Sequence, residues 1–234
     1  MGDQLLAERD SIWNGPADRA FSSDALTDMA DPALALLSPS HLFTRADVLA
    51  TPCPTPRSPG VYAWYFDEVP EAVPTEGCHA ALGHTLLYVG ISPSAPPTNG
   101  ATPSRQTLRS RVRYHYRGNA YGSTLRLTLG CLLAVRLGIT LRRVGSGKTR
   151  TFTNPGEQAL DAWMARHAKV VWVAMERPWD LEAQLIRALS LPLNIMDNEA
   201  HAFCARLRGL RRETLARALE MPVADRGGRR SAVP

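Results

Sequence analysis

The sequence predicts an α+β domain in which a small sheet is flanked by helices. Two β-prone segments, residues 61–66 and 85–92, lie close together in the first half of the chain. Segments with helical periodicity follow them, and residues 170–175 are typical of a buried strand. Hydrophobic residues make up 44% of the 234 positions, which is enough for one sizeable core or two small ones. Disordered, collagen-like and disulfide-scaffold classes are therefore excluded.

The first 57 residues are interpreted as an N-terminal extension. Short helical patterns alternate there with turn residues, and the Pro-rich end of this segment predicts a linker. The strands over 61–66 and 85–92 come next, and the loop that joins them suggests a hairpin.

The next elements are expected from their start and stop signals. Ser104 is a candidate N-cap for a helix that ends at Gly118, and Ser123 is a candidate N-cap for a helix that ends at Gly138. Residues 139–153 have the pattern of a strand, a turn and a second strand.

A further helix start follows at Asn154, with Pro155 at the first helical position and Glu157 three residues after the cap. The strand over 170–175 comes next, and then a helix that ends near Pro192.

Residues 197–234 are interpreted as a basic helical segment with a frayed tail. Phe203 and Leu207 share one apolar face, whereas Leu215 points well away from it at about 100° per residue. We therefore expect two short helices that meet near Gly209.

Charge is distributed unevenly along the chain. Residues 1–76 contain four basic and 12 acidic residues, whereas residues 77–156 contain 11 basic residues and no Asp or Glu. Residues 157–234 contain 12 basic and 10 acidic residues, which leaves a net charge of +5. Positive charge gathered on one segment attracts a polyanion, and nucleic acid is the commonest one available. Alternatively, these arginines pair with the acidic N-terminal third.

Several classes of site are not indicated. The four cysteines form no CxxC pair and the six histidines lack metal-motif spacing, so a structural zinc site is not expected. The sequence GSGKT at 145–149 lacks the first glycine of a phosphate-binding loop and lies where a turn is expected. No apolar run matches a membrane span and the acidic N-terminus does not resemble a secretory signal. We therefore expect a cytoplasmic protein with reduced thiols and no membrane partner.

Candidate catalytic residues lie on four of the expected elements. Tyr62 and Tyr88 each lie in a strand near a glycine. Arg111 and His115 are four residues apart and share one face of an Arg-rich helix. Glu182 lies at the rim of the apolar stripe of a later helix.

This order of residues, with Asn194 after the last helix, resembles the GIY-YIG nuclease superfamily. Residues 60–62 (Gly-Val-Tyr) are similar to its GIY element and residues 88–90 (Tyr-Val-Gly) to its YIG element. The resemblance covers residues 58–196. It implies a catalytic domain with a small, mainly antiparallel sheet flanked by helices, and an endonuclease that cuts DNA.

The resemblance also implies roles for the charged residues. Glu182 would bind one Mg²⁺ or Mn²⁺, hard cations that prefer oxygen ligands. Arg111 would stabilise the phosphate through its fork of donors. Further arginines are expected to contact the nucleic acid: Arg105, Arg109, Arg113, Arg117 and Arg126.

The remaining roles concern proton transfer and positioning. Tyr62 is the candidate general base, supported by Tyr88, and needs cationic neighbours because the reference pKa of tyrosine is about 10. His115 would accept or orient the proton of Tyr62. Asn194 would hold the metal site or the scissile phosphate in place.

Each of these residues also has an ordinary structural interpretation. The tyrosines are compatible with strand aromatics, the arginine with a solvated charge and the histidine with a packing residue. The glutamate is compatible with an ion pair or a position facing water, and the asparagine with a helix cap. The tryptophans are expected in the core rather than as stacking platforms for bases: Trp13, Trp163, Trp172 and Trp179.

The leading hypothesis is a metal-dependent phosphodiesterase that acts on DNA, with RNA not excluded. One alternative is a nucleic-acid-binding protein that keeps this fold and does not cut. Another is a protein-interaction domain whose basic face meets an acidic partner. The C-terminal segment is expected to cover the core, to meet another subunit, or to give a second DNA contact through its arginines: Arg206, Arg208, Arg211 and Arg212. No particular oligomeric state is predicted.

Overall fold

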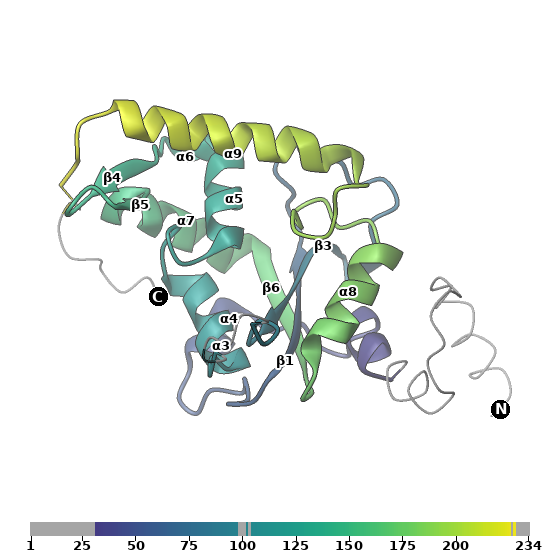
Figure 1. The fold of residues 1–234 in the computed structure, drawn as a ribbon. Coiled ribbons are helices and arrows are strands. Elements are labelled where there is room, and N and C mark those ends of the chain that lie inside the picture. The colour runs from purple at the N-terminus through teal and green to yellow at the C-terminus, as the bar shows by residue number, and fades with distance from the viewer. Residues whose placement is uncertain (1–30, 98–101, 103, 226, 228–234) are drawn as a thin grey trace, which may run out of the picture.

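A computed structural model describes residues 31–97, 102, 104–225 and 227 and has one antiparallel sheet at its centre (Figure 1). The sheet has the strand order β2-β3-β1-β6, and every neighbouring pair is antiparallel. Its strands are β1 (Gly60–Phe66), β2 (Ala80–Ala81), β3 (His84–Ser92) and β6 (Ala168–Ala174). The predicted α+β class is confirmed, and so is the antiparallel pairing of the two strands that carry the tyrosines.

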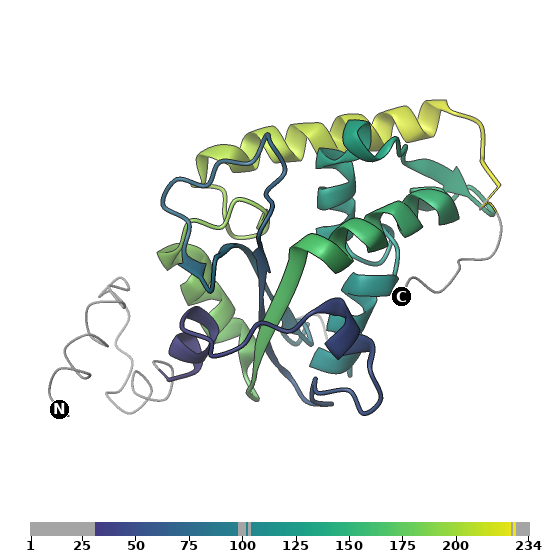
Figure 2. The same ribbon diagram turned by 180° about the vertical axis from the view of Figure 1, so that it is seen from behind.

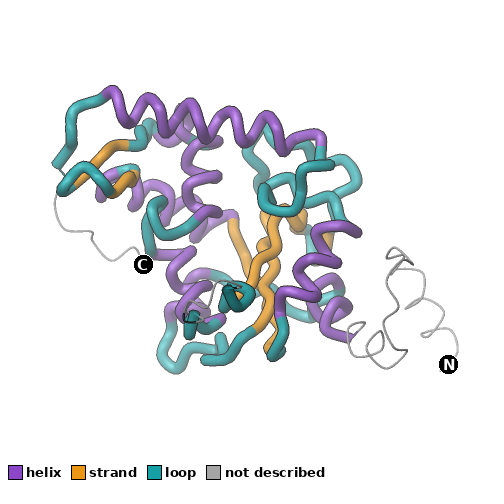
Figure 3. The backbone as a smooth tube through the Cα atoms, in the orientation of Figure 1, coloured by secondary structure: helices purple, strands orange, loops and turns teal. Residues whose placement is uncertain are grey.

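Helices lie on both sides of the sheet (Figure 3). They are α3 (Arg45–Leu49), α4 (Leu108–Arg117), α5 (Thr124–Leu132), α6 (Ala134–Leu137), α7 (Thr153–His167), α8 (Pro178–Ala188) and α9 (Ala202–Glu220), and residues 31–37 are also helical. Strands β4 (Arg142–Val144) and β5 (Thr149–Thr151) form a separate hairpin, as expected. Within the described parts of the chain, no helix is long and apolar enough to cross a membrane.

Strand β1 is buried along its whole length because both faces of the sheet are covered. Tyr62 and Trp64 point to one face and pack with side chains of α4, α5 and α7. Val61 and Ala63 point to the other face and pack with α8 and the helix at 31–37. The alternation therefore directs the tyrosine of the first motif towards the Arg-rich helix.

Residues 31–57, expected to be an extension and a linker, pack against the domain. Figure 2 shows the start of this segment, in purple, crossing the molecule beside β6. Phe43 and Val170 of β6 exchange two backbone hydrogen bonds of 2.9 Å. The Arg109 guanidinium of α4 donates to the main-chain oxygen of Thr55, over 2.6 Å. Residues 1–30 of the expected extension lie outside the described residues.

Two expected helix starts are wrong. Helix α4 is capped by Thr107, whose side chain accepts from the backbone of Ser110, and not by Ser104. Helix α7 begins two residues earlier than expected, with Phe152 rather than Asn154 as its N-cap. The Glu157 carboxylate accepts from the backbone N–H of Phe152 over 3.2 Å and pairs with Arg126, so it does not cap a helix that starts at Asn154.

The C-terminal segment forms one continuous helix, α9, and the expectation of two helices is wrong. Its two apolar faces contact different parts of the molecule. Phe203 and Leu207 belong to the main core, whereas Leu215 and Ala218 pack in a separate cluster with Phe152. A single helix satisfies both contacts. The frayed tail was expected over residues that lie mostly outside the described ones.

Candidate active site

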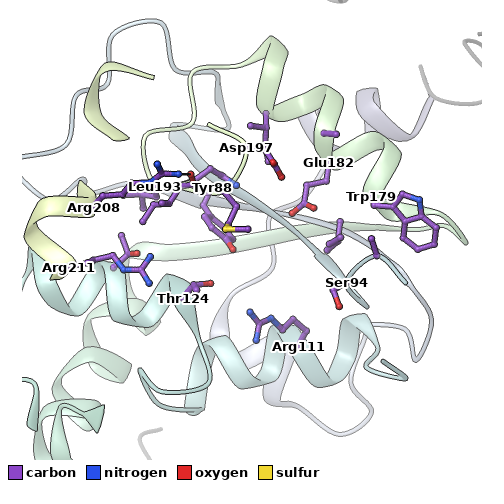
Figure 4. Close-up of a pocket in the computed structure, with 18 of the residues that line it drawn as sticks. Tyr88, Ser94, Arg111, Thr124, Trp179, Glu182, Leu193, Asp197, Arg208 and Arg211 are labelled. Carbon is purple, nitrogen blue, oxygen red and sulfur yellow. Dashed lines mark hydrogen bonds between the residues drawn. The ribbon is translucent and has the colours of Figure 1, made fainter. Parts of the chain in front are cut away.

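A pocket of about 1120 Å³ lies between the sheet and helix α9 (Figure 4). Tyr62 from β1 and Tyr88 from β3 line it, with Arg111 from α4, Glu182 from α8 and Asn194 from the following loop. Five of the six expected catalytic residues therefore meet in one cavity. The sixth, the histidine of α4, lies directly behind the first tyrosine.

The glycines of both motifs leave room for close contacts. Tyr62 is directly opposite Gly90 in the β1–β3 pair. A Cβ atom at Gly90 would lie 2.6 Å from the Tyr62 hydroxyl oxygen, and a Cβ atom at Gly60 would lie 2.1 Å from the carbonyl oxygen of Val173. Both distances are too short for real atoms, so glycine is a steric requirement at each position.

We predict that Gly90→Ala lowers both stability and activity. The new methyl group must displace the Tyr62 ring, and overpacking of this kind costs roughly 1–3 kcal/mol of unfolding free energy. The control is Gly209→Ala, because this helical glycine has nothing near its Cβ position and alanine favours the helix. Thermal unfolding of both variants checks the prediction, and an unchanged melting temperature for Gly90→Ala contradicts it.

A buried chain of hydrogen-bonding groups leads away from Tyr62. Its hydroxyl lies 2.9 Å from Nε2 of His115, and Nδ1 of His115 lies 2.7 Å from Oγ of Ser123. Burial lowers the pKa of His115 well below its usual value, and the cations Arg111 and Arg126 lower it further. The imidazole is therefore neutral near pH 7, and Nε2 is available to accept the proton of the Tyr62 hydroxyl. Ser123 was expected only as the cap of α5, a role it also has.

Both tyrosines are neutral in the free protein. Burial raises the pKa of Tyr62 well above its usual value, and the neighbouring Tyr88 raises it further. Arg111 lies beside the hydroxyl and opposes this effect, as the sequence suggested, but burial is the larger cause. Burial likewise raises the pKa of Tyr88. The free site therefore holds Tyr62 as a proton donor to the imidazole.

Glu182 is an acid without a cationic partner. Burial raises the pKa of its carboxyl group to about 7, and the charge of Asp197 adds to the effect. Figure 4 shows both carboxylates pointing into the same side of the pocket. No ion pair or hydrogen bond from a described residue reaches the Glu182 carboxylate.

This environment fits a divalent cation. The exposed Asp197 carboxylate repels the partly buried Glu182 carboxylate, and a hard cation with oxygen ligands would relieve the repulsion. Glu182 and Asp197 are the residues that could hold it. Among the described residues, this pocket included, no group of three or more His, Cys, Asp or Glu side chains could hold a metal ion, so these two carboxylates are the acidic ligands that the pocket offers. Sequence reasoning missed Asp197, and its signal was an acid three residues after the motif asparagine.

Asn194 is fixed to the backbone of β3. Its amide oxygen accepts from the main-chain N–H of Val89 and its amide nitrogen donates to the Val89 carbonyl, both over 2.9 Å. Asn198 then donates to the Asn194 carbonyl over 3.1 Å. These bonds tie the loop that carries Asp197 to the strand that carries Tyr88.

Arg111 presents its guanidinium to the pocket. One nitrogen donates to the carbonyl oxygen of Gly122 over 2.9 Å. The group points into the cavity from the side opposite Glu182 (Figure 4). A guanidinium held in this way has donors left for an anion.

The structure corrects the role expected for Arg126. Its side chain has no exposed surface and lies 2.6 Å from the Glu157 carboxylate and 2.7 Å from that of Asp161. It also donates to the main-chain oxygen of His115 over 3.1 Å. Arg126 therefore supports the end of α4 from inside the core and cannot reach a nucleic acid.

The other four arginines expected to contact nucleic acid differ in exposure. Arg109 and Arg113 are partly buried and donate to main-chain oxygens of residues 48–55. Arg105 and Arg117 are exposed. These two remain on the surface around the Arg-rich helix.

The tryptophans also differ in location. Trp163 is buried in the main core, and Trp172 is partly buried and stacks on Phe43 with ring centroids 4.2 Å apart. Trp179 differs from the expectation because it lines the pocket, on the same helix as the glutamate. Trp13 lies outside the described residues.

One of three comparisons with known proteins found a match. A sequence model of the family described as the GIY-YIG catalytic domain matches residues 60–213, which is more than half of the chain. The match includes both tyrosine motifs, the Arg-rich helix, α8 and α9 as far as residue 213. No curated protein and no solved structure matches the chain.

Proposed function

Since the chain belongs to the GIY-YIG catalytic domain family, whose domain is of nuclease type, we propose that it is a metal-dependent endonuclease that hydrolyses phosphodiester bonds of DNA. One observation carries the proposal. Glu182, an acid without a cationic partner, and Arg111, a cation with free donors, lie on opposite sides of the pocket that also contains Tyr62 and Tyr88. A phosphodiester needs an activated water, neutralised charge and help for the departing oxygen.

Arg111 would bind the scissile phosphate. Its fork of N–H donors matches two non-bridging oxygens and stabilises the charge that develops on them. Its partly buried position strengthens the interaction, because water competes less for the oxygens.

Tyr62 would act as the general base that activates the attacking water. The water oxygen forms a bond to phosphorus as its proton passes to the Tyr62 hydroxyl oxygen, and the Tyr62 proton passes to Nε2 of His115. The bond from phosphorus to the leaving oxygen breaks in the same displacement, and this oxygen departs as an alkoxide that takes a proton from a solvent water. The 2.9 Å contact between Tyr62 and the neutral imidazole supports this relay.

Glu182 would hold the divalent cation, with Asp197 nearby and the Asn194 bonds keeping the loop in place. Mg²⁺ or Mn²⁺ bound there would neutralise charge on the phosphate and the departing oxygen. The buried carboxylate must be deprotonated to bind the ion, and its raised pKa makes this step sensitive to pH near neutrality.

A cleavage assay tests the proposal. Purified protein is incubated with supercoiled plasmid, with branched DNA and with RNA, in Mg²⁺, Mn²⁺ or EDTA. We expect nicked or linear DNA with either metal and intact DNA with EDTA. Salt-sensitive binding without cleavage would instead favour the non-cleaving alternative, and neither binding nor cleavage would reject both.

We predict that Tyr62→Phe lowers the cleavage rate by about a hundredfold or more, because it removes the oxygen that receives the water proton. Tyr65→Phe is the matched control. It lies on the same strand, and its hydroxyl donates on the other face of the sheet, to the main-chain oxygen of Leu36. Single-turnover cleavage checks the prediction, and near-normal rates for Tyr62→Phe would exclude it as the base.

A further inference from the structure

Helix α9 forms one wall of the pocket and brings three arginines to it: Arg208, Arg211 and Arg212. Arg208 is engaged, because it donates to the main-chain oxygen of Ile195 and pairs with Glu199. Arg212 is exposed. Arg211 is partly buried and points into the cavity (Figure 4). Arg211 is therefore the partly buried arginine of α9 whose guanidinium is directed into the cavity.

Arg211 is a desolvated cation without an acid beside it. Burial lowers the pKa of its guanidinium, and the groups that oppose this are the Cys131 thiol and the Tyr88 hydroxyl. No carboxylate of a described residue forms an ion pair with it. The buried guanidinium of Arg126 differs, because it forms ion pairs with the carboxylates of Glu157 and Asp161. A desolvated charge without a partner is costly, and an anionic ligand would offset the cost.

The position of Arg211 relates it to the proposed reaction. Tyr88 lines the same pocket as Glu182, Arg111 and Arg211. Figure 4 shows Arg111 and Arg211 entering the cavity from two directions, while Glu182 and Asp197 occupy another side. Arg111 and Arg211 thus lie apart from each other and from the acidic side of the pocket.

We propose that Arg211 is a second phosphate-binding residue, which holds a nucleic-acid phosphate next to the scissile one that Arg111 binds. A guanidinium is suited to this ligand because its planar fork matches phosphate oxygens. The inference rests on the proposed function and makes α9 part of the substrate site. The nucleic-acid backbone would then run from Arg111 along the pocket to α9.

DNA binding in EDTA tests the proposal without cleavage. Anisotropy of a labelled 30-base-pair duplex is measured over a range of salt concentrations. We expect Arg211→Gln to weaken binding by roughly tenfold and to reduce the slope of log affinity against log salt by about 1. Arg211→Lys keeps the charge without the fork and should restore part of the affinity. Arg217→Gln is the control, because it removes the same charge from an exposed position of α9 outside the pocket.

Stability and kinetics separate a binding role from a structural one. Arg211→Gln should leave the melting temperature unchanged or raise it, because a desolvated charge is removed. In Mg²⁺ it should raise the half-saturating DNA concentration while the turnover rate changes by less than about threefold. A lower melting temperature with unchanged affinity would show that Arg211 only supports the fold.

The remaining outcomes distinguish this inference from the proposed function. Equal losses of affinity in Arg211→Gln and Arg217→Gln would overturn the inference, even if the wild-type protein cuts DNA. If Arg211→Gln binds DNA more weakly than the wild-type protein, and the wild-type protein never cuts DNA, the inference is supported and the proposed function is overturned. A wild-type protein that neither binds nor cuts nucleic acid would overturn both.

Discussion

Glu182→Gln is expected to abolish metal-dependent cleavage, with a fall in rate of about a thousandfold or more. The amide is nearly isosteric with the acid but has no charge with which to hold a divalent cation. Metal catalysis of phosphoryl transfer contributes several kcal/mol, and about 4 kcal/mol corresponds to a thousandfold in rate. Glu176→Gln is the control, because this exposed carboxylate lies just before α8 and outside the pocket.

Metal binding gives a readout that does not depend on cleavage. Mn²⁺ titration followed by electron paramagnetic resonance should show a site in the wild-type protein and in Glu176→Gln, and none in Glu182→Gln. In the wild-type protein the affinity should rise as pH increases through about 7, where the Glu182 carboxyl group loses its proton. An unchanged affinity in Glu182→Gln would place the metal elsewhere.

The same substitution should also stabilise the metal-free protein at alkaline pH. The folded pKa of Glu182 is about 7 against a reference value of 4.5, so the folded state favours the protonated acid. Its contribution to stability is therefore present below about pH 4.5 and is lost as pH rises through about 7. Glu182→Gln should raise the melting temperature at pH 8 and have little effect at pH 5.

Arg111→Ala is expected to lower the turnover rate by at least about a hundredfold, which corresponds to roughly 3 kcal/mol of transition-state stabilisation. Much of the DNA affinity should remain, because other arginines contribute to it. Arg105→Ala offers the comparison, since this exposed arginine precedes α4 and is outside the pocket lining. It should weaken binding without changing turnover.

Two measurements decide the role of Arg111. Single-turnover cleavage at saturating DNA reports the chemical step, and anisotropy in EDTA reports binding. A large and selective loss of binding in Arg111→Ala, with turnover unchanged, would mean that the residue binds the substrate and takes no part in the reaction.

Local patterns in the sequence predict much of the fold. The alternating segments that became β1 and β3 and the turn between β4 and β5 depend on neighbouring residues, so they could be predicted. The helix expected to run from Ser123 to Gly138 is divided at Leu133 into α5 and α6, which no local signal in the sequence indicated. The continuity of α9 depends on tertiary packing and could not be predicted. Leu215 points away from Phe203 in the sequence pattern, and only the second apolar cluster explains why one helix carries both.

In the candidate site too, features set by local sequence could be predicted and features set by tertiary packing could not. The order of motifs predicts which residues line the pocket, because each lies on a recognisable element. Properties that depend on burial could not be predicted. The sequence does not show that Arg126 pairs with Glu157 and Asp161 instead of facing a nucleic acid. Pairing of the basic stretch with the acidic N-terminal third was the alternative, and it occurs at Arg136, which pairs with Glu68.

Helix α9 sets a lower limit on the length of chain that can fold independently. Its Phe203 end covers the main core and its Ala218 end covers the cluster around Phe152. A fragment that stops at residue 196 would expose apolar surface at both places and would also leave the cavity open on one side. Truncations intended for crystallisation or for activity assays should therefore retain the chain through Glu220.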